Sequence, residues 1–181
     1  MEHREALLLL LGATNSPVRG RTAVQKMIYF TAVKTASPKQ WGYRPHYYGP
    51  YSDLVASGLQ DLVNMGFVEE SSEVMPNHGV VYTYSLTTDG RAFVKIVTTK
   101  EKRETLSVIR AVLVKCREAS RKNVNVLSWA AKTYFLLTSG RSIPTIEEVK
   151  NEGMKLGWSL EPREISEGIQ LLQALQLVRT S

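Results

Sequence analysis

The basic side chains of the first fifty residues could bind phosphate, because no carboxylate balances them. Between Ala6 and Ser52 the sequence contains neither Asp nor Glu. Lysine and arginine displace counterions from a phosphate backbone, so an unbalanced basic segment suits a polyanion. A solvated basic face beside an aromatic core explains the same residues equally well. The cations of this segment are Arg19, Arg21, Lys26, Lys34, Lys39 and Arg44.

Five further polar residues complete the candidate surface for nucleic acid. Two belong to an expected third helix, one to a hairpin loop where it could touch a backbone phosphate, and two to a basic helix. These residues are Ser52 and Gln60, His78, and Arg103 and Arg110.

The charge of the expected third helix argues against ordinary DNA binding. It carries Asp53 and Asp61 and no basic residue. The third helix of a helix-turn-helix protein normally presents basic or amide side chains to base edges in the major groove. An acidic helix would be repelled by the phosphates on either side of that groove.

Aromatic residues are concentrated in the second half of the basic segment. Tyr47, Tyr48 and Tyr51 flank the Gly49-Pro50 step, whose backbone is rigid. A buried tyrosine contributes a large apolar area together with a hydroxyl that needs a partner. We therefore expect these rings to stabilise the fold rather than to line a catalytic site.

No set of residues has the spacing of a catalytic or metal site. The histidines His3, His46 and His78 are far apart in sequence and lie beside no nucleophile motif. Cys116 is the only cysteine, which excludes an internal disulfide and a cysteine-based zinc site. We therefore predict that the chain is not an enzyme and that it has no cofactor and no metal.

Size and composition limit the class of protein. The chain has 181 residues, a net charge of +6 and a pI of about 9.5. This length suits one large domain or two small ones. The apolar runs are too short to span a bilayer and no signal peptide is evident, so we expect a cytoplasmic protein without membrane contact. The basic pI favours nucleic acid and leaves acidic protein partners open.

Periodicity and turn residues predict a mainly α-helical fold with a small β-hairpin. Three helices are expected before Gly66, two strands over 67–74 and 80–86, and a further helix from Asp89. Helix, helix, helix, hairpin is the order of a winged helix-turn-helix unit, with the hairpin as the wing. The predicted divisions are a winged-helix domain (1–98), a basic connecting helix (99–123) and a second, wingless helix-turn-helix-like domain (124–181).

The second domain is predicted from an internal repeat. Residues 57–68 align on 167–178 without a gap, and Gly58 corresponds to Gly168. Helices are expected upstream over 126–138 and 143–157, and Pro162 suits the first position of a third helix. Three helices thus precede each copy, which favours tandem units joined by the basic helix.

Two segments resemble a known family. Gly20 to Phe30, followed by His46 to Ser52, resembles the YwgA-like family of prokaryotic proteins and, more distantly, the Panacea domain found in antitoxins. Tyr84 to Arg91 is similar to the passage from wing to helix in many winged-helix regulators. The resemblance covers residues 1 to about 95 and implies a winged-helix-like α+β fold with an interaction function.

These observations predict a nucleic-acid-binding protein that regulates transcription, contacts DNA largely through phosphates and forms a homodimer. The alternative is a protein-interaction module, such as an antitoxin or an assembly scaffold, built on tandem winged helices. The overall pI favours the first interpretation, and the charge of the third helix favours the second.

Overall fold

The computed structural model describes residues 1–14, 16–35, 38–98, 103–140 and 145–179. The chain is mainly helical, with one small antiparallel sheet. The elements in chain order are α1 (His3–Gly12), β1 (Val18–Arg19), α2 (Arg21–Thr35), η1 (Pro38–Trp41), α3 (Asp53–Asn64), β2 (Val68–Val74), β3 (Val80–Leu86), α4 (Thr88–Val97), α5 (Arg103–Lys122), α6 (Val126–Ser139), α7 (Ile146–Lys155) and α8 (Pro162–Ala174).

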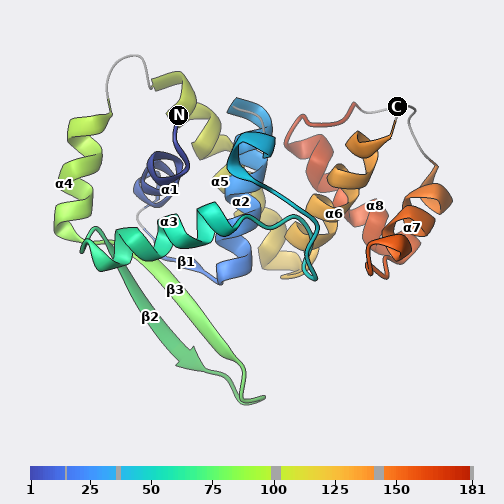
Figure 1. The fold of residues 1–181 in the computed structure, drawn as a ribbon, viewed down its shortest axis with the longest axis horizontal. Helices are drawn as coiled ribbons and strands as arrows, with labels where there is room; N and C mark the ends of the chain where they lie inside the picture. The colour runs from blue at the N-terminus through green and yellow to red at the C-terminus, as the bar shows by residue number, and fades with distance from the viewer. Residues whose placement is uncertain (15, 36–37, 99–102, 141–144, 180–181) are drawn as a thin grey trace.

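The hairpin of β2 and β3 projects away from the helices (Figure 1). The sequence predicted this hairpin, and the structure confirms it. A third strand, β1, pairs with β3 on the other side and gives the sheet order β1-β3-β2. The sequence did not predict β1, because a strand of two residues within a segment rich in turn residues shows no alternation of apolar and polar residues. Tyr84 on β3 lies between Val18 on β1 and Glu70 on β2, and these two pairings fix its position in the middle of the sheet.

Helix α2 lies at the centre of the molecule (Figure 1). Every residue from Val24 to Ala32 is buried, because α1, α3, α5 and α6 all pack against this helix. Two buried residues, Gln25 and Lys26, carry polar groups that must find partners inside the protein. The central position of α2 therefore creates the polar interior described below.

Helix α5 packs against α1 and α2 as well as against α6 and α8, and it contributes to a core that these helices share. Its buried residues Ile109, Val112, Leu113 and Cys116 pack in one hydrophobic cluster with residues of α1, α2 and α6. Residues 99–102 of the predicted connecting helix lie outside the described residues. The division of the chain at this helix stays a prediction.

The last three helices form a smaller cluster around Trp158, which is fully buried with Leu136, Val149, Leu160 and Ile165. Helix α8 begins at Pro162, as the sequence predicted. Helix α7 begins at Ile146 after a capping box at Thr145. It falls within the helix expected over 143–157 with a start at Pro144 or Thr145, and residues 143–144 lie outside the described residues.

Candidate functional site

A pocket of about 280 Å³ opens where the first two turns of α2 meet α3, the 42–51 segment and the sheet. Helix α2 contributes the polar side chains Arg21, Gln25 and Lys26. Helix α3 contributes an apolar wall that includes Val55 and Leu59. Mostly apolar walls with a few convergent polar groups are typical of a small-molecule site.

Arg21 stands at the sheet side of this pocket in a network with Tyr84 and Glu70. Its Nε donates a hydrogen bond to the Tyr84 hydroxyl at 3.0 Å, and its Nη2 lies 3.4 Å from Glu70 Oε2. The Tyr84 hydroxyl in turn donates to the same Glu70 oxygen. The Arg21 guanidinium also lies 3.5 Å from the centre of the Tyr82 ring. Its positive charge is therefore compensated within the protein.

Ionisation of this network is set by burial and hydrogen bonding. Burial and the hydrogen bond to Glu70 raise the pKa of Tyr84 to about 12. The hydrogen bond to Tyr84 raises the pKa of Arg21 further above its ordinary value. At neutral pH the Tyr84 hydroxyl thus remains a donor and Arg21 remains charged.

Gln25 joins α2 to the start of α3. Its side-chain nitrogen donates to the Ser52 carbonyl at 2.9 Å, and its side-chain oxygen accepts from the Ser52 N–H at 3.2 Å. Ser52 is fully buried, and its hydroxyl caps α3 by accepting from the Val55 N–H while donating to the Trp41 carbonyl. Ser52, a predicted nucleic-acid contact, therefore holds α3 in place.

Lys26 lies inside the molecule, with only 1% of its surface exposed. Its ammonium group donates to the Pro50 carbonyl at 2.8 Å. Burial, with a smaller contribution from the positive charge of Lys132, lowers the pKa of Lys26 to about 7. The sequence placed this lysine on a phosphate-binding surface, whereas the structure places it in the pocket.

The 42–51 segment forms the outer wall of the pocket. Arg44 and Tyr51 exchange two backbone hydrogen bonds, so the residues between them form a closed loop. Gly49 adopts a positive φ of 93° in this loop, where a Cβ would lie 2.9 Å from the Lys132 side chain on α6. Trp158 donates from its ring nitrogen to the His46 carbonyl at 2.7 Å, which ties the loop to the C-terminal helices.

Two tyrosines of this loop face solvent. Tyr47 and Tyr48 are 72% and 56% exposed, and their rings meet edge to face with centroids 4.8 Å apart. We call this pair the tyrosine tip. The expectation of buried tyrosines is wrong for both rings, because the loop presents them outward. Tyr51 is half-buried and lies against His46.

Other predicted cations are held by partners within the chain. Arg19 pairs with Glu73 at 3.1 Å, and Arg44 pairs with Asp53 at 2.8 Å. The Lys34 ammonium donates to the Leu175 carbonyl at 2.7 Å. The pair of Arg21 with Glu70 is a third contact with a carboxylate. Three of the six cations of the carboxylate-free segment, Arg19, Arg21 and Arg44, thus face carboxylates that follow this segment in the chain.

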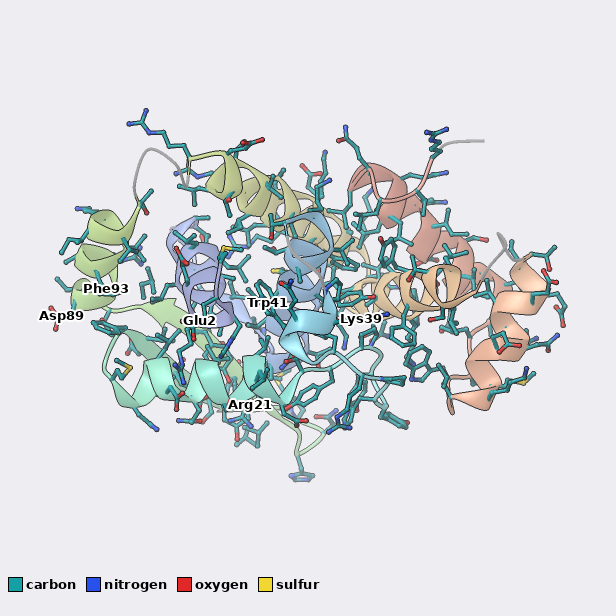
Figure 2. All side chains as sticks on the ribbon, turned by 45° about the horizontal axis from the view of Figure 1, so that its top comes forward. Glu2, Arg21, Lys39, Trp41, Asp89 and Phe93 are labelled. Carbon is teal, nitrogen blue, oxygen red and sulfur yellow. The ribbon has the colours of Figure 1, made fainter. Side chains whose placement is uncertain are left out.

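The remaining candidates are scattered. Lys39 is exposed on η1, beside the buried Trp41 (Figure 2). Gln60 borders the pocket and donates to Asn64, and His78, with a positive φ of 61°, sits in the loop at the far end of the hairpin. Arg103 and Arg110 are exposed on α5, which runs along the upper edge of the molecule in Figure 2, while α3 runs along the lower edge. The structure therefore does not gather the predicted residues into one surface.

The sequence indicated no role at this site for three residues of the pocket region, namely Tyr84, Glu70 and Lys132. Alternation along 80–86 could have indicated that Tyr84 points inward. The approach of Lys132 to Lys26 had no local signal, because it depends on how α6 packs against α2. Within the described ranges, no cluster of His, Cys, Asp and Glu has the arrangement of a metal site. No helix in those ranges is long and apolar enough to cross a membrane.

Comparison with known proteins gives one informative similarity. The chain is 37% identical over 93 residues to the "Uncharacterized protein YwgA" of Bacillus subtilis (strain 168). The matched part is 51% of this chain and 55% of that protein, so the chain spans about half the length of the curated relative. No protein-family model matches. The similarity supports the YwgA-like resemblance and brings no activity with it.

Proposed function

We propose that the chain is a protein-interaction module built on a winged-helix unit in residues 1–98. The order α1, β1, α2, α3, β2, β3 supports this assignment. Further support comes from β1 pairing along β3 and from the hairpin, which projects as a wing would (Figure 1). A second, wingless helix-turn-helix-like unit within 124–181 completes the proposed tandem arrangement. An antitoxin or an assembly scaffold would use such a module to hold another protein.

The internal pairing of the predicted phosphate-binding cations carries this proposal. Arg19, Arg21 and Arg44 already face carboxylates, and a phosphate would have to compete with those carboxylates for the guanidinium charge. The large exposed side chains beside them are instead the tyrosine tip and Leu54, which is 47% exposed at the start of α3. Exposed tyrosines beside a pocket are typical anchors of protein–protein interfaces.

The exposed side of α3 fits a protein better than a DNA groove. A winged-helix protein that reads DNA normally inserts the N-terminal part of this helix into the major groove. Here that end carries Asp53, and Asp61 follows two turns later in a pair with Arg4. Ser57 and Gln60 offer neutral hydrogen-bonding groups between them. This combination suits a polar protein surface with an aromatic anchor at its edge.

One observation favours nucleic acid as a second candidate. Helix α5 exposes Arg103, Arg110, Arg121 and Lys122, and within the described part of the chain none of them has a carboxylate at ion-pair distance. Such a surface could contact a phosphate backbone without sequence preference. It lies across the molecule from α3, so a complex of this kind would not use the wing and third helix together.

A comparison of three purified proteins tests the proposal: the wild type, Tyr47→Ser/Tyr48→Ser, and Arg103→Gln/Arg110→Gln. A partner first identified by crosslinking in cells would be purified and titrated against each of them. We expect at least a tenfold loss of affinity for the tyrosine variant, since anchor side chains dominate interface energy, and no change for the arginine variant.

A titration of short duplexes of unrelated sequence over a salt series supplies the opposing outcome. We expect no saturable binding at physiological salt. Binding that is equal on all sequences, and whose log–log salt slope falls by about two units in the arginine variant, would replace the interaction module with the nucleic-acid function.

A further inference from the structure

The buried ammonium group of Lys26 has unused hydrogen-bonding capacity. An ammonium has three N–H donors. The Pro50 carbonyl is the acceptor that the described residues provide for it. Polar groups buried as deeply as this one are normally satisfied, and unused capacity calls for an explanation such as a functional role, a water molecule or a bound ion. Lys26 borders the pocket, so a molecule in the pocket could supply a further acceptor.

Charges around the pocket are unevenly compensated. At the sheet side, Arg21 is paired with Glu70. At the Lys26 side, Lys132 on α6 adds a second positive charge. Among the described residues, Glu164 on α8 supplies the opposing negative charge, which partly offsets the lowering of the Lys132 pKa by burial. A single negative charge placed beside Lys26 would balance the uncompensated positive charge on this side of the pocket.

The remaining walls restrict the ligand further. Val24, Val55 and Leu59 give the pocket an apolar surface, and its volume of about 280 Å³ admits only a small molecule. A phosphate group would require several cations or a set of converging backbone N–H groups. The pocket instead offers the Lys26 ammonium beside apolar side chains, while the other cation of its lining, Arg21, is paired with Glu70.

We propose that this pocket binds a small, largely apolar monocarboxylate, whose carboxylate accepts hydrogen bonds from Lys26. The apolar part of the ligand lies against α3. The site goes beyond the protein-interaction function and does not depend on it. Because Tyr48 borders the same pocket, an occupied pocket would also change the surroundings of the tyrosine tip.

The choice of lysine at this buried position supports a binding role. A methionine would fill similar space and would avoid removing an ammonium from water. A buried residue that lowers the stability of the fold in this way is typical of a functional site. The lowered pKa of Lys26 is consistent with a group that lacks its anionic partner in the free protein.

Benzoate, benzamide and inorganic phosphate serve as probes, because benzamide keeps the shape of benzoate without its charge. Calorimetric titration would be carried out on the wild type, Lys26→Met and Lys150→Met. Lys150 is a partly buried lysine on α7 that pairs with Glu161 and lies outside the pocket, which makes it a matched control.

We expect saturable binding of benzoate to the wild type and to Lys150→Met. Benzamide should bind the wild type at least tenfold more weakly, and Lys26→Met should lose at least tenfold in benzoate affinity, because a charge-assisted hydrogen bond is removed in each case. The comparison of benzoate with benzamide decides the matter even if Lys26→Met does not fold. Equal affinity for the two probes, no saturable benzoate binding, tighter binding of phosphate, or unchanged affinity in a folded Lys26→Met protein would each overturn the proposal.

Discussion

The third helices of the two halves, α3 and α8, end in the same way but lie in different surroundings. After α3, Gly66 takes a positive φ of 76° and the Phe67 N–H donates to the Leu62 carbonyl at 3.0 Å. After α8, Gln176 takes a positive φ of 56° and the Leu177 N–H donates to the Leu172 carbonyl at 2.9 Å. These positions correspond in the ungapped alignment of 57–68 with 167–178. The aligned segments therefore share the geometry of one helix end as well as part of their sequence.

The middle helices of the two halves differ in how far they are enclosed, which explains why the buried side chains of Gln25 and Lys26 lie in the first half. Helix α2 is enclosed on several sides, whereas α7 buries only Val149 and Gly153 and lies at the edge of the molecule. Polar side chains on an edge helix can turn toward water. On α2, Gln25 and Lys26 cannot, so they bind backbone groups and form the pocket. The pocket is therefore found beside α2 because α2 is enclosed by other helices, whereas α7 is not.

The largest expected effect concerns the small cluster of the C-terminal half. Replacing the fully buried Trp158 with Ala should lower the free energy of unfolding by about 3–5 kcal/mol, because a large cavity forms. It also removes the hydrogen bond to the His46 carbonyl. Urea denaturation would measure the loss, and hydrogen exchange should show α7 opening before α2. Trp158→Phe is the control, with a smaller loss. A change below about 1 kcal/mol for Trp158→Ala would show that the cluster does not stabilise this half.

The paired glycines of the repeat give the next prediction. A Cβ at Gly168 would lie 3.0 Å from the backbone nitrogen of Ala130, so Gly168→Ala should destabilise by about 1–3 kcal/mol through overpacking. A Cβ at Gly58 would instead meet side-chain atoms of His3 and Arg4, which can rotate away. Alanine also has the higher helix propensity, so Gly58→Ala should stay within about 0.5 kcal/mol of the wild type. Thermal and urea unfolding of both variants would test this order, and equal losses would contradict it.

Local patterns predicted the elements, and long-range packing determined the site. The hairpin, the start of α8 at Pro162 and the repeated helix end all depend on a few neighbouring residues, so periodicity and turn residues were sufficient. The partners of the cations lie far away in sequence: Arg19 meets Glu73, and Lys34 meets the Leu175 carbonyl. A charge pattern read along the chain cannot show that two opposite segments face each other. The exposed Tyr48 and the buried Lys26 were misplaced for the same reason.

The central position of Lys26 predicts a dependence of stability on pH. Its pKa of about 7 in the folded protein lies below the ordinary value, so the unfolded chain binds more protons above about pH 7. The free energy of unfolding should therefore rise with pH, by about 1 kcal/mol between pH 7 and pH 8, in the wild type relative to Lys26→Met. Tyr29 and Cys116, whose pKa values burial raises, act in the opposite direction only at higher pH. Denaturation of both proteins across this range would measure the difference. Parallel curves would mean that Lys26 keeps its ordinary pKa.

The caps of two helices, one buried and one exposed, should differ in what they contribute to stability. Ser52→Ala removes the α3 cap and leaves the buried Trp41 carbonyl without its donor, so the loss should be about 2 kcal/mol. Thr145→Ala removes an exposed cap of α7, where water can replace the lost hydroxyl, and should cost about 0.5–1 kcal/mol. Urea denaturation midpoints of the two alanine variants would measure this difference of about 1 kcal/mol. Ser52→Thr and Thr145→Ser, which keep a hydroxyl at each cap, are the controls. The exchange at 145 should be nearly neutral, while the exchange at 52 adds a methyl group at a fully buried position and should destabilise. If Ser52→Ala costs no more than Thr145→Ala, the buried junction between Gln25, Ser52 and Trp41 does not hold α3 against α2, and the pocket wall formed by α3 would have to be held by apolar packing alone.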